Sequence, residues 1–161
     1  MSDLVIRAAQ DDDSENLIRL IGAVYAEYPG CVLDVDAEMP ELRKPASAAE
    51  IDDGCWWVAE SGREIVGSVA VVPEGENVVE LKKLYVSPAL RRRGLGAQLV
   101  ALAEREARGR RASRVILWTD TRFADAHRLY ARLGYVQAPR TRVLGDLSNT
   151  IEYHYSKELG A

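Results

Sequence analysis

The sequence predicts a single α/β domain on a mixed, mostly antiparallel sheet with a parallel pair of strands at its centre, flanked by helices. The first observation is a β-branched run, Val78–Val86, followed by a basic turn, a helical pattern over 94–108 and a second β-branched run over 114–119. Strands joined through a helix in this way are parallel neighbours. The second observation is a pair of runs, 56–60 and 64–72, separated by a glycine-containing turn, which predicts a hairpin that pairs antiparallel with Val78–Val86. The third is length, because 161 residues suit one domain.

The remaining elements carry weaker signals. Asp11–Asp13 place acids where a helix dipole favours them, so a helix should start there, and Tyr28-Pro29-Gly30 should end it. Pro40 and Pro45 interrupt residues 34–50, which predict only a short helix or an ordered loop. The other expected elements are a first strand over 4–8, a helix over 124–132, and closing strands over 135–137 and 150–155.

A basic turn with two glycines, Arg91–Gly96, connects the strand 78–86 to the helix 94–108. Gly94 and Gly96 lack a Cβ atom, so a ligand can approach the backbone there. The N–H groups of the first helical turn have no internal partners and can bind a phosphate. Arginine guanidiniums add donors suited to phosphate oxygens. The turn therefore predicts a pyrophosphate site.

Two common phosphate motifs do not account for this turn. The Walker loop requires Gly-Lys-Ser or Gly-Lys-Thr, and neither occurs in the chain. The dinucleotide fingerprint is Gly-x-Gly-x-x-Gly/Ala directly after a strand. Here Leu99 stands where the last Gly or Ala is required, and seven residues separate the end of the strand at Val86 from Gly94. The pattern that fits is Arg/Gln-x-x-Gly-x-Gly/Ala, matched by Arg91, Gly94 and Gly96.

With this pattern the chain resembles the GNAT superfamily of acetyl-CoA-dependent N-acetyltransferases. A second signature, Ala-x-x-Leu-Tyr-x-x-x-Gly-Phe/Tyr, is matched from Ala126 to Tyr135, and the pieces follow in family order over about residues 63–138. The resemblance implies one N-acetyltransferase domain over 1–161, with an acyl-CoA-binding core at 63–138 and an acceptor-side region at 1–62. One departure is Phe123, which stands where the family often has Asn, so a polar contact to the cofactor is not expected from that side chain.

The resemblance also implies how acetyl-CoA, the co-substrate, is held. The central parallel strands splay, and the pantetheine arm lies in the gap against free strand backbone, where an N–H group polarises the acetyl carbonyl. No metal is expected. The cofactor-binding residues that the resemblance implies are Leu84, Tyr85, Val86, Arg91, Arg92, Arg93, Gly94, Leu95, Gly96 and Ala97.

Acetyl transfer to an amine is helped by a base that deprotonates the ammonium and an acid that protonates the departing thiolate. Glu80, near the start of the strand 78–86, is the candidate base, directly or through water. Tyr130, in the second signature, is the candidate acid, and a core tyrosine is the alternative. His127, one turn earlier on the same helix, is a weaker candidate.

Strand alternation predicts that Glu80 shares a face with Lys82, Leu84 and Val86. Two alternative roles for Glu80 are a surface carboxylate paired with Lys82 or Lys83 and a residue that binds the acceptor.

Charge is divided unevenly along the chain. Residues 1–80 carry a net charge of −13, residues 81–142 carry +11 and residues 143–161 carry −2. An anionic cofactor on the basic part and a cationic acceptor on the acidic part account for both signs. Acids beside aromatic rings suit an ammonium group, although a solvated acidic loop is the alternative. Because the family walls its acceptor pocket with the N-terminal region, the implied acceptor-binding residues are Tyr25, Tyr28, Asp34, Asp36 and Glu38.

Composition argues against several other classes. No apolar run approaches the roughly 20 residues of a membrane span, and the N-terminus lacks the pattern of a signal peptide. Cys31 and Cys55 belong to no metal-spaced cluster and are expected to be reduced thiols of a cytoplasmic protein. A nucleic-acid partner is not expected, because no aromatic residues interleave with Arg91–Arg93.

The expected function is transfer of an acetyl group from acetyl-CoA to a primary amine by direct attack in a ternary complex. A small-molecule acceptor is favoured. The alternatives are a non-catalytic acyl-CoA-binding sensor and an acetyltransferase of protein N-termini or lysines. The sequence leaves open the identity of the amine, the acyl chain preference and a homodimer.

Overall fold

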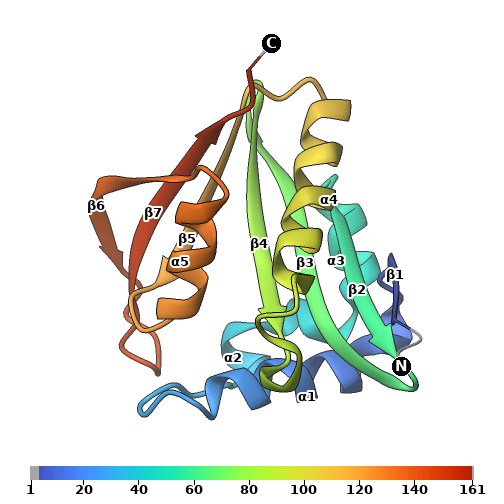
Figure 1. Ribbon diagram of the computed structural model, residues 1–161. Helices are drawn as coiled ribbons and strands as arrows, with labels where there is room; N and C mark the ends of the chain where they lie inside the picture. Colours follow the sequence, from blue (N-terminus) through green and yellow to red (C-terminus); the bar gives the residue numbers. More distant parts are fainter. Residues whose placement is uncertain (1–3, 161) are drawn as a thin grey trace.

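Seven strands form one mixed sheet in the order β1-β2-β3-β4-β5-β7-β6, with helices on both faces (Figure 1). The structure is a computed structural model that describes residues 4–160. The strands are β1 (Leu4–Ala8), β2 (Cys55–Ser61), β3 (Glu64–Gly75), β4 (Val78–Val86), β5 (Arg114–Asp120), β6 (Val136–Val143) and β7 (Ile151–Glu158). The α-helices are α1 (Ser14–Tyr25), α2 (Val35–Glu38), α3 (Pro45–Ile51), α4 (Leu95–Gly109) and α5 (Ala124–Arg132), and the 3₁₀-helices are η1 (Asp11–Asp13), η2 (Pro40–Arg43) and η3 (Pro88–Leu90).

The predicted fold class is confirmed. The hairpin β2–β3 pairs antiparallel with β4, and α4 carries the chain from β4 to the parallel strand β5. The segment 34–50 contains α2, η2 and α3, and Pro40 and Pro45 stand in the first turns of η2 and α3, where a missing N–H costs least. The closing strands are longer than predicted, and β7 inserts between β5 and β6.

Two apolar cores lie on opposite faces of the sheet. One face is covered by α4, which buries Leu99, Val100 and Ala103 against strand residues such as Val71 and Leu117. The other face is covered by α1 and the short helices that follow it. Within residues 4–160, no helix combines the length and the apolar character needed to cross a membrane.

The parallel strands β4 and β5 separate soon after they meet (Figure 1). Their paired residues run only from Val78 to Glu80 on β4 and from Arg114 to Ile116 on β5. From Leu81 onward the β5-facing edge of β4 has no strand partner among the described residues. Its backbone polar groups there are available to a ligand.

A β-bulge in β4 lies at this divergence. Ser68 of β3 pairs with Tyr85 and Ala70 pairs with Lys82, so β4 has one extra residue in the interval, and Lys83 has a positive φ of 57°. A bulge bends its strand and reverses the alternation of side chains.

The prediction that Glu80, Lys82, Leu84 and Val86 share one face is therefore wrong. Leu84 and Val86 pack against the core beneath α4, whereas Tyr85 packs against the core beneath α1.

Candidate active site

Two cavities meet at the gap between β4 and β5. The first, of about 470 Å³, lies between the start of α4 and α5, and we refer to it as the cofactor pocket. The second, of about 300 Å³, lies between α1, α2 and the β6–β7 hairpin, and we refer to it as the acceptor pocket. Both are lined by Leu84, Tyr85, Phe123 and Ala126. One site on β4 is therefore reached from two sides.

The two glycines of the basic turn have different structural roles. Gly94 is the N-cap of α4 and has a left-handed φ of 82°, which other residues adopt only with strain. A Cβ atom at Gly96 would lie 2.9 Å from Cδ2 of Leu129, so the absence of a side chain lets α5 approach the start of α4. Among residues 4–160 no side chain caps α4, so its first N–H groups are available to a ligand.

The predicted cofactor residues divide into two groups. The cofactor pocket is lined by Leu84, Tyr85, Val86, Arg91, Arg92, Gly94, Gly96 and Ala97. Leu95 is instead buried in the core beneath α4 with 3% of its surface exposed, and Arg93 lies outside the lining. The guanidinium of Arg91 donates to both carboxylate oxygens of Glu27 at 2.6 and 2.7 Å.

Glu80 lines the acceptor pocket at the last paired position of β4. Its carboxylate is half-buried, and burial raises its pKa. Within residues 4–160 this carboxylate accepts no hydrogen bond and forms no ion pair. Of the two lysines that could pair with it, Lys83 binds Glu41 instead, with Nζ 2.7 Å from Oε2, and the Lys82 side chain is exposed to solvent. The surface ion pair that was the alternative for Glu80 is therefore not formed.

Tyr130 lines the acceptor pocket from α5. The residue is buried, which raises its pKa, and its ring packs 5.8 Å from Tyr135 and 5.7 Å from Tyr155 between centroids. In the described part of the chain its hydroxyl has no hydrogen-bond partner. Nε2 of His127, by contrast, lies 2.9 Å from the carbonyl oxygen of Asp120, and His127 lines neither pocket.

Three of the five predicted acceptor residues line the acceptor pocket, and two do not. Tyr25, Asp34 and Glu38 line the acceptor pocket. The Asp34 carboxylate caps α2 by accepting a hydrogen bond from the Ala37 N–H group at 3.0 Å, and Glu38 accepts one from the Leu147 N–H group at 2.8 Å.

The other two predicted acceptor residues lie elsewhere. Asp36 is outside the lining and binds Arg43 at 3.0 Å. Tyr28 lines the cofactor pocket, where its ring centroid is 5.0 Å from that of Phe123. Phe123 also packs on Tyr25, with centroids 6.2 Å apart, so these three rings form an aromatic wall between the pockets.

Comparison with known proteins decides the family. The model of the Acetyltransferase (GNAT) family matches residues 21–135. The chain belongs to the GNAT acetyltransferase family. It is 31% identical over 139 residues to an uncharacterized N-acetyltransferase, YjgM, of Escherichia coli, covering 81% of each chain. It is 33% identical over 121 residues to N-acetyltransferase 8F1 of Rattus norvegicus, covering 72% of this chain but only 52% of that protein.

The fold agrees with this assignment. The PaiA N-acetyltransferase of Thermoplasma acidophilum, solved in complex with coenzyme A, superposes with a TM-score of 0.75 at 17% identity, covering 97% of this chain and 99% of the other. Family and relatives together identify the chain as an N-acetyltransferase.

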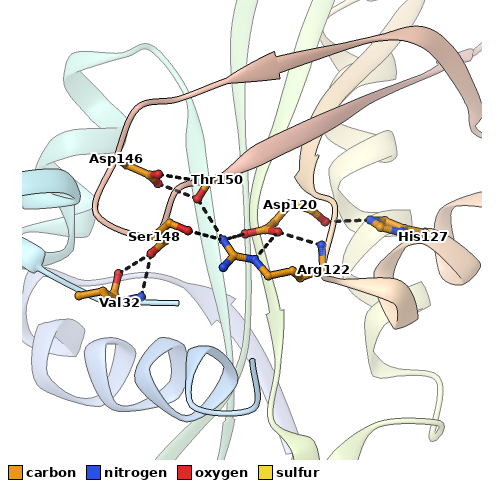
Figure 2. A network of polar contacts seen from close by, with 7 residues as sticks. All are labelled: Val32, Asp120, Arg122, His127, Asp146, Ser148 and Thr150. Atoms are coloured by element: carbon orange, nitrogen blue, oxygen red, sulfur yellow. Dashed lines mark hydrogen bonds and ion pairs between the residues drawn. The ribbon is translucent and has the colours of Figure 1, made fainter. Parts of the chain in front are cut away.

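In this GNAT domain a polar network shapes one wall of the acceptor pocket (Figure 2). The guanidinium of Arg122 donates to both carboxylate oxygens of Asp120 and to the carbonyl oxygen of Ser148 at 2.9–3.0 Å. The Ser148 hydroxyl accepts from the Val32 N–H group at 2.7 Å and donates to the Val32 carbonyl oxygen at 3.1 Å. Asp146 accepts from both the N–H and the hydroxyl of Thr150 at 2.7 Å. The network joins the end of β5, the loop after α1 and the β6–β7 hairpin.

The same wall supplies pocket residues that sequence reasoning missed. They are Trp118, Asp120, Arg142, Asp146 and Glu152. Asp120 is the last residue of β5, which runs parallel to β4, so its place at the carboxyl end of a central strand could have marked it as a site residue. The residues on β6 and β7 carry no such signal, because their position depends on β7 inserting between β5 and β6.

The acceptor pocket is acidic. Its lining contains three cationic side chains and six carboxylates, giving a formal net charge of −3. Five of these carboxylates already accept a hydrogen bond or form an ion pair. Glu80 is the remaining one.

Proposed function

We propose that this protein transfers an acetyl group from acetyl-CoA to a small primary amine by direct attack in a ternary complex. The observation that carries the proposal is the meeting of a basic pocket and an acidic pocket at one gap in the sheet. Two substrates of opposite charge can then occupy the site together. A covalent enzyme intermediate is not needed in this arrangement.

The cofactor pocket fits coenzyme A. Arg91, Arg92 and the first N–H groups of α4 would hold the pyrophosphate, and Gly94 and Gly96 let it approach the backbone. The unpaired edge of β4 over Leu84–Val86 would hydrogen-bond the pantetheine arm and polarise the thioester carbonyl. Acetyl-CoA supplies the acetyl group as a reactive thioester.

Glu80 would take the proton from the acceptor. An alkylammonium with a pKa near 10.4 is neutral in only about one part in 10³ to 10⁴ at pH 7, so a nearby base accelerates attack by roughly 10²–10⁴-fold. Among residues 4–160 the Glu80 carboxylate, which lines the pocket, has no hydrogen-bond or ion-pair partner, and burial raises its pKa, which makes it a stronger base. It can act on the ammonium directly or through water.

Tyr130 would supply the proton to the departing sulfur. Burial raises the pKa of Tyr130, so the hydroxyl is protonated at neutral pH and available as a donor. The acceptor ammonium loses two protons in all. Glu80 takes the first before attack and passes it to solvent. The nitrogen loses the second as the carbon–nitrogen bond forms and the carbon–sulfur bond breaks, and this proton replaces the one that Tyr130 gives to sulfur.

A small cationic acceptor is supported over a peptide. The formal charge of −3 attracts an ammonium group. The bonds from Leu147 to Glu38 and from Val32 to Ser148 tie the β6–β7 hairpin to the segment around α2 and narrow the pocket. A volume of about 300 Å³ is at the lower end of small-molecule sites.

A screen of acceptors tests the proposal. Purified protein and acetyl-CoA are mixed with polyamines, aminoglycosides, amino acids and short peptides, and release of free CoA is measured. We expect turnover with at least one small cationic amine and slower turnover with peptides. Gly94→Asp is the matched control, because its carboxylate would repel the pyrophosphate. Binding of acetyl-CoA with no turnover above background in the whole panel would favour the sensor instead.

A further inference from the structure

Arg142 brings unused hydrogen-bond donors into the acceptor pocket. The three cationic side chains in its lining are Lys82, Lys83 and Arg142. Lys83 binds Glu41, and the Lys82 side chain is exposed to solvent. Arg142 differs from both because its guanidinium is fixed in place and yet only partly used.

Two neighbours hold the Arg142 guanidinium. Arg142 of β6 stands opposite Glu152 of β7 in the antiparallel register, and its Nε donates to Oε1 of Glu152 at 2.7 Å. Its Cζ lies 4.2 Å from the ring centroid of Trp118 on β5, a distance at which a cation and an aromatic ring attract each other. The Arg142 side chain is thus fixed on two sides, although 44% of its surface is exposed.

The terminal nitrogens of Arg142 remain free. Within residues 4–160 neither Nη1 nor Nη2 donates a hydrogen bond, because Glu152 uses only the Nε donor. In the neighbouring network of Figure 2, by contrast, Arg122 donates to Asp120 and to the Ser148 carbonyl oxygen. The Nη1–Nη2 edge of a guanidinium can bind a carboxylate through two parallel hydrogen bonds.

Glu80 lies on the same face of the sheet as this guanidinium. Glu80 pairs with Ile116 of β5, and Trp118 follows Ile116 by two residues, so the three side chains share that face. Two residues of a strand span about 6–7 Å. The Arg142 guanidinium on Trp118 is therefore separated from the Glu80 carboxylate by about the length of a small molecule.

The charges of Glu80 and Arg142 also interact. Burial raises the pKa of Glu80, whereas the positive charges of Lys82 and Arg142 lower it. The acceptor pocket thus presents two groups of opposite charge to one ligand. One is the carboxylate on β4, and the other is the free edge of the guanidinium on β6.

We propose that Arg142 binds a carboxylate of the acceptor, so that the substrate is a small amino acid and not a plain amine. The inference rests on the proposed function, because it takes Glu80 as the place where the reacting amine binds. The amino acid spans the pocket, with an amino group at Glu80 and its carboxylate on the Nη1–Nη2 edge of Arg142. A basic amino acid fits best, because its second ammonium group retains the net positive charge that suits the acidic lining.

Paired acceptors test the proposal. Ornithine is compared with putrescine, and β-alanine with ethylamine, because the members of each pair differ by one carboxylate. Any better carboxylated acceptor from the screen is paired in the same way with its decarboxylated counterpart. The kcat/KM of each acceptor is measured at saturating acetyl-CoA, and the ratio within each pair is compared between wild type and variants. Differences in the intrinsic reactivity of the amines cancel in that comparison.

The variants are Arg142→Gln, Arg142→Lys and a matched control, Arg140→Gln. Arg140 is also on β6, with Cζ 5.4 Å from the Trp118 centroid, but it is outside the lining of both pockets. Its replacement removes one positive charge from the same region without removing a donor from the acceptor pocket. Arg142→Lys keeps the charge and lacks the forked donors. Thermal unfolding of each variant checks that the fold is retained.

Arg142→Gln should lower the ratio about 10-fold through a higher KM for the carboxylated acceptor, as loss of a charge-assisted contact requires. Its kcat/KM for the plain amine should equal or exceed that of wild type, because a cation that repels the ammonium is gone. Arg142→Lys should lower the ratio by about 3-fold. Arg140→Gln should leave it unchanged.

A ratio that survives Arg142→Gln would overturn the inference, and so would an equal fall in Arg140→Gln. An equal loss for both members of a pair would show that Arg142 acts only on the structure. Turnover confined to amines without a carboxylate would also overturn it. If wild type acetylates no amine at all, the proposed function itself fails, and that result differs from each of these.

Discussion

Replacing Glu80 with Gln separates a catalytic carboxylate from a structural one. The Glu80 side chain is half-buried, has no protein partner within the described residues, and has a pKa raised by burial. A group whose pKa is raised on folding contributes stability that is present at low pH and lost as the pH rises through its folded pKa. At pH 7 the charged carboxylate therefore opposes folding, and Glu80→Gln should leave the free energy of unfolding unchanged or raise it by up to about 1 kcal/mol.

Activity should change in the opposite direction. Glu80→Gln should lower kcat by roughly 10²–10⁴-fold near pH 7, the range for loss of a general base. The deficit should shrink as the pH approaches the pKa of the amine, because more of the acceptor is then neutral without help. In wild type the rate should fall as the pH drops through the raised pKa of Glu80, and this limb should be absent from the variant. Initial rates of CoA release between pH 5.5 and 9, with urea unfolding at pH 7, measure both effects.

Glu152→Gln is the matched control. Glu152 lines the same pocket but accepts a hydrogen bond from Nε of Arg142 at 2.7 Å. Loss of this charged hydrogen bond should lower the free energy of unfolding by up to about 1 kcal/mol. The fall in rate at low pH should remain as in wild type. The reasoning is refuted if Glu80→Gln destabilises the protein more than Glu152→Gln does while keeping the wild-type pH profile.

Three further variants test other parts of the site. Tyr130→Phe should lower kcat by about 10–10³-fold with little change in acetyl-CoA affinity or stability, and steady-state kinetics with a wild-type kcat would exclude Tyr130 as the acid. Arg122→Gln removes donors to the buried carboxylate of Asp120 and should lower the free energy of unfolding in urea by about 1–3 kcal/mol. It should also raise the KM of the acceptor more than the KM of acetyl-CoA. An acceptor KM equal to that of wild type would show that the network does not shape the pocket. Glu27→Gln frees Arg91 for phosphate and should tighten CoA binding a few-fold by calorimetry, more at low salt, whereas weaker binding would mean that Glu27 orients Arg91 for the ligand.

Much of the fold could be predicted because its signals are local. The period of apolar residues separates strands from helices, and α5 runs over Ala124–Arg132 as predicted. A strand, a helix and a second strand in sequence require a parallel pair, and β4 and β5 form one. Gly94 marks the start of α4 because only glycine takes a left-handed φ of 82° without strain.

The bulge in β4 had no such signal. Lysine seldom takes a positive φ, and nothing in the residues around Lys83 distinguishes it from an ordinary strand residue. The alternating pattern therefore placed Leu84 and Val86 on the face of Glu80, which is wrong. With the bulge, Leu84 and Val86 pack against the core beneath α4 and Tyr85 against the core beneath α1, and these contacts exist only in the assembled sheet.

The sequence by itself determined the order of the main strands and helices and the turn that begins α4. The tertiary structure decided which charged groups are free to act. Arg91 is engaged by Glu27, 64 residues away, and Glu38 by the backbone of Leu147, 109 residues away, while Glu80 has no partner in the described chain. The sequence gives the type and the spacing of each charged residue. Whether its charge has an ion-pair or hydrogen-bond partner depends on neighbours that only folding brings together.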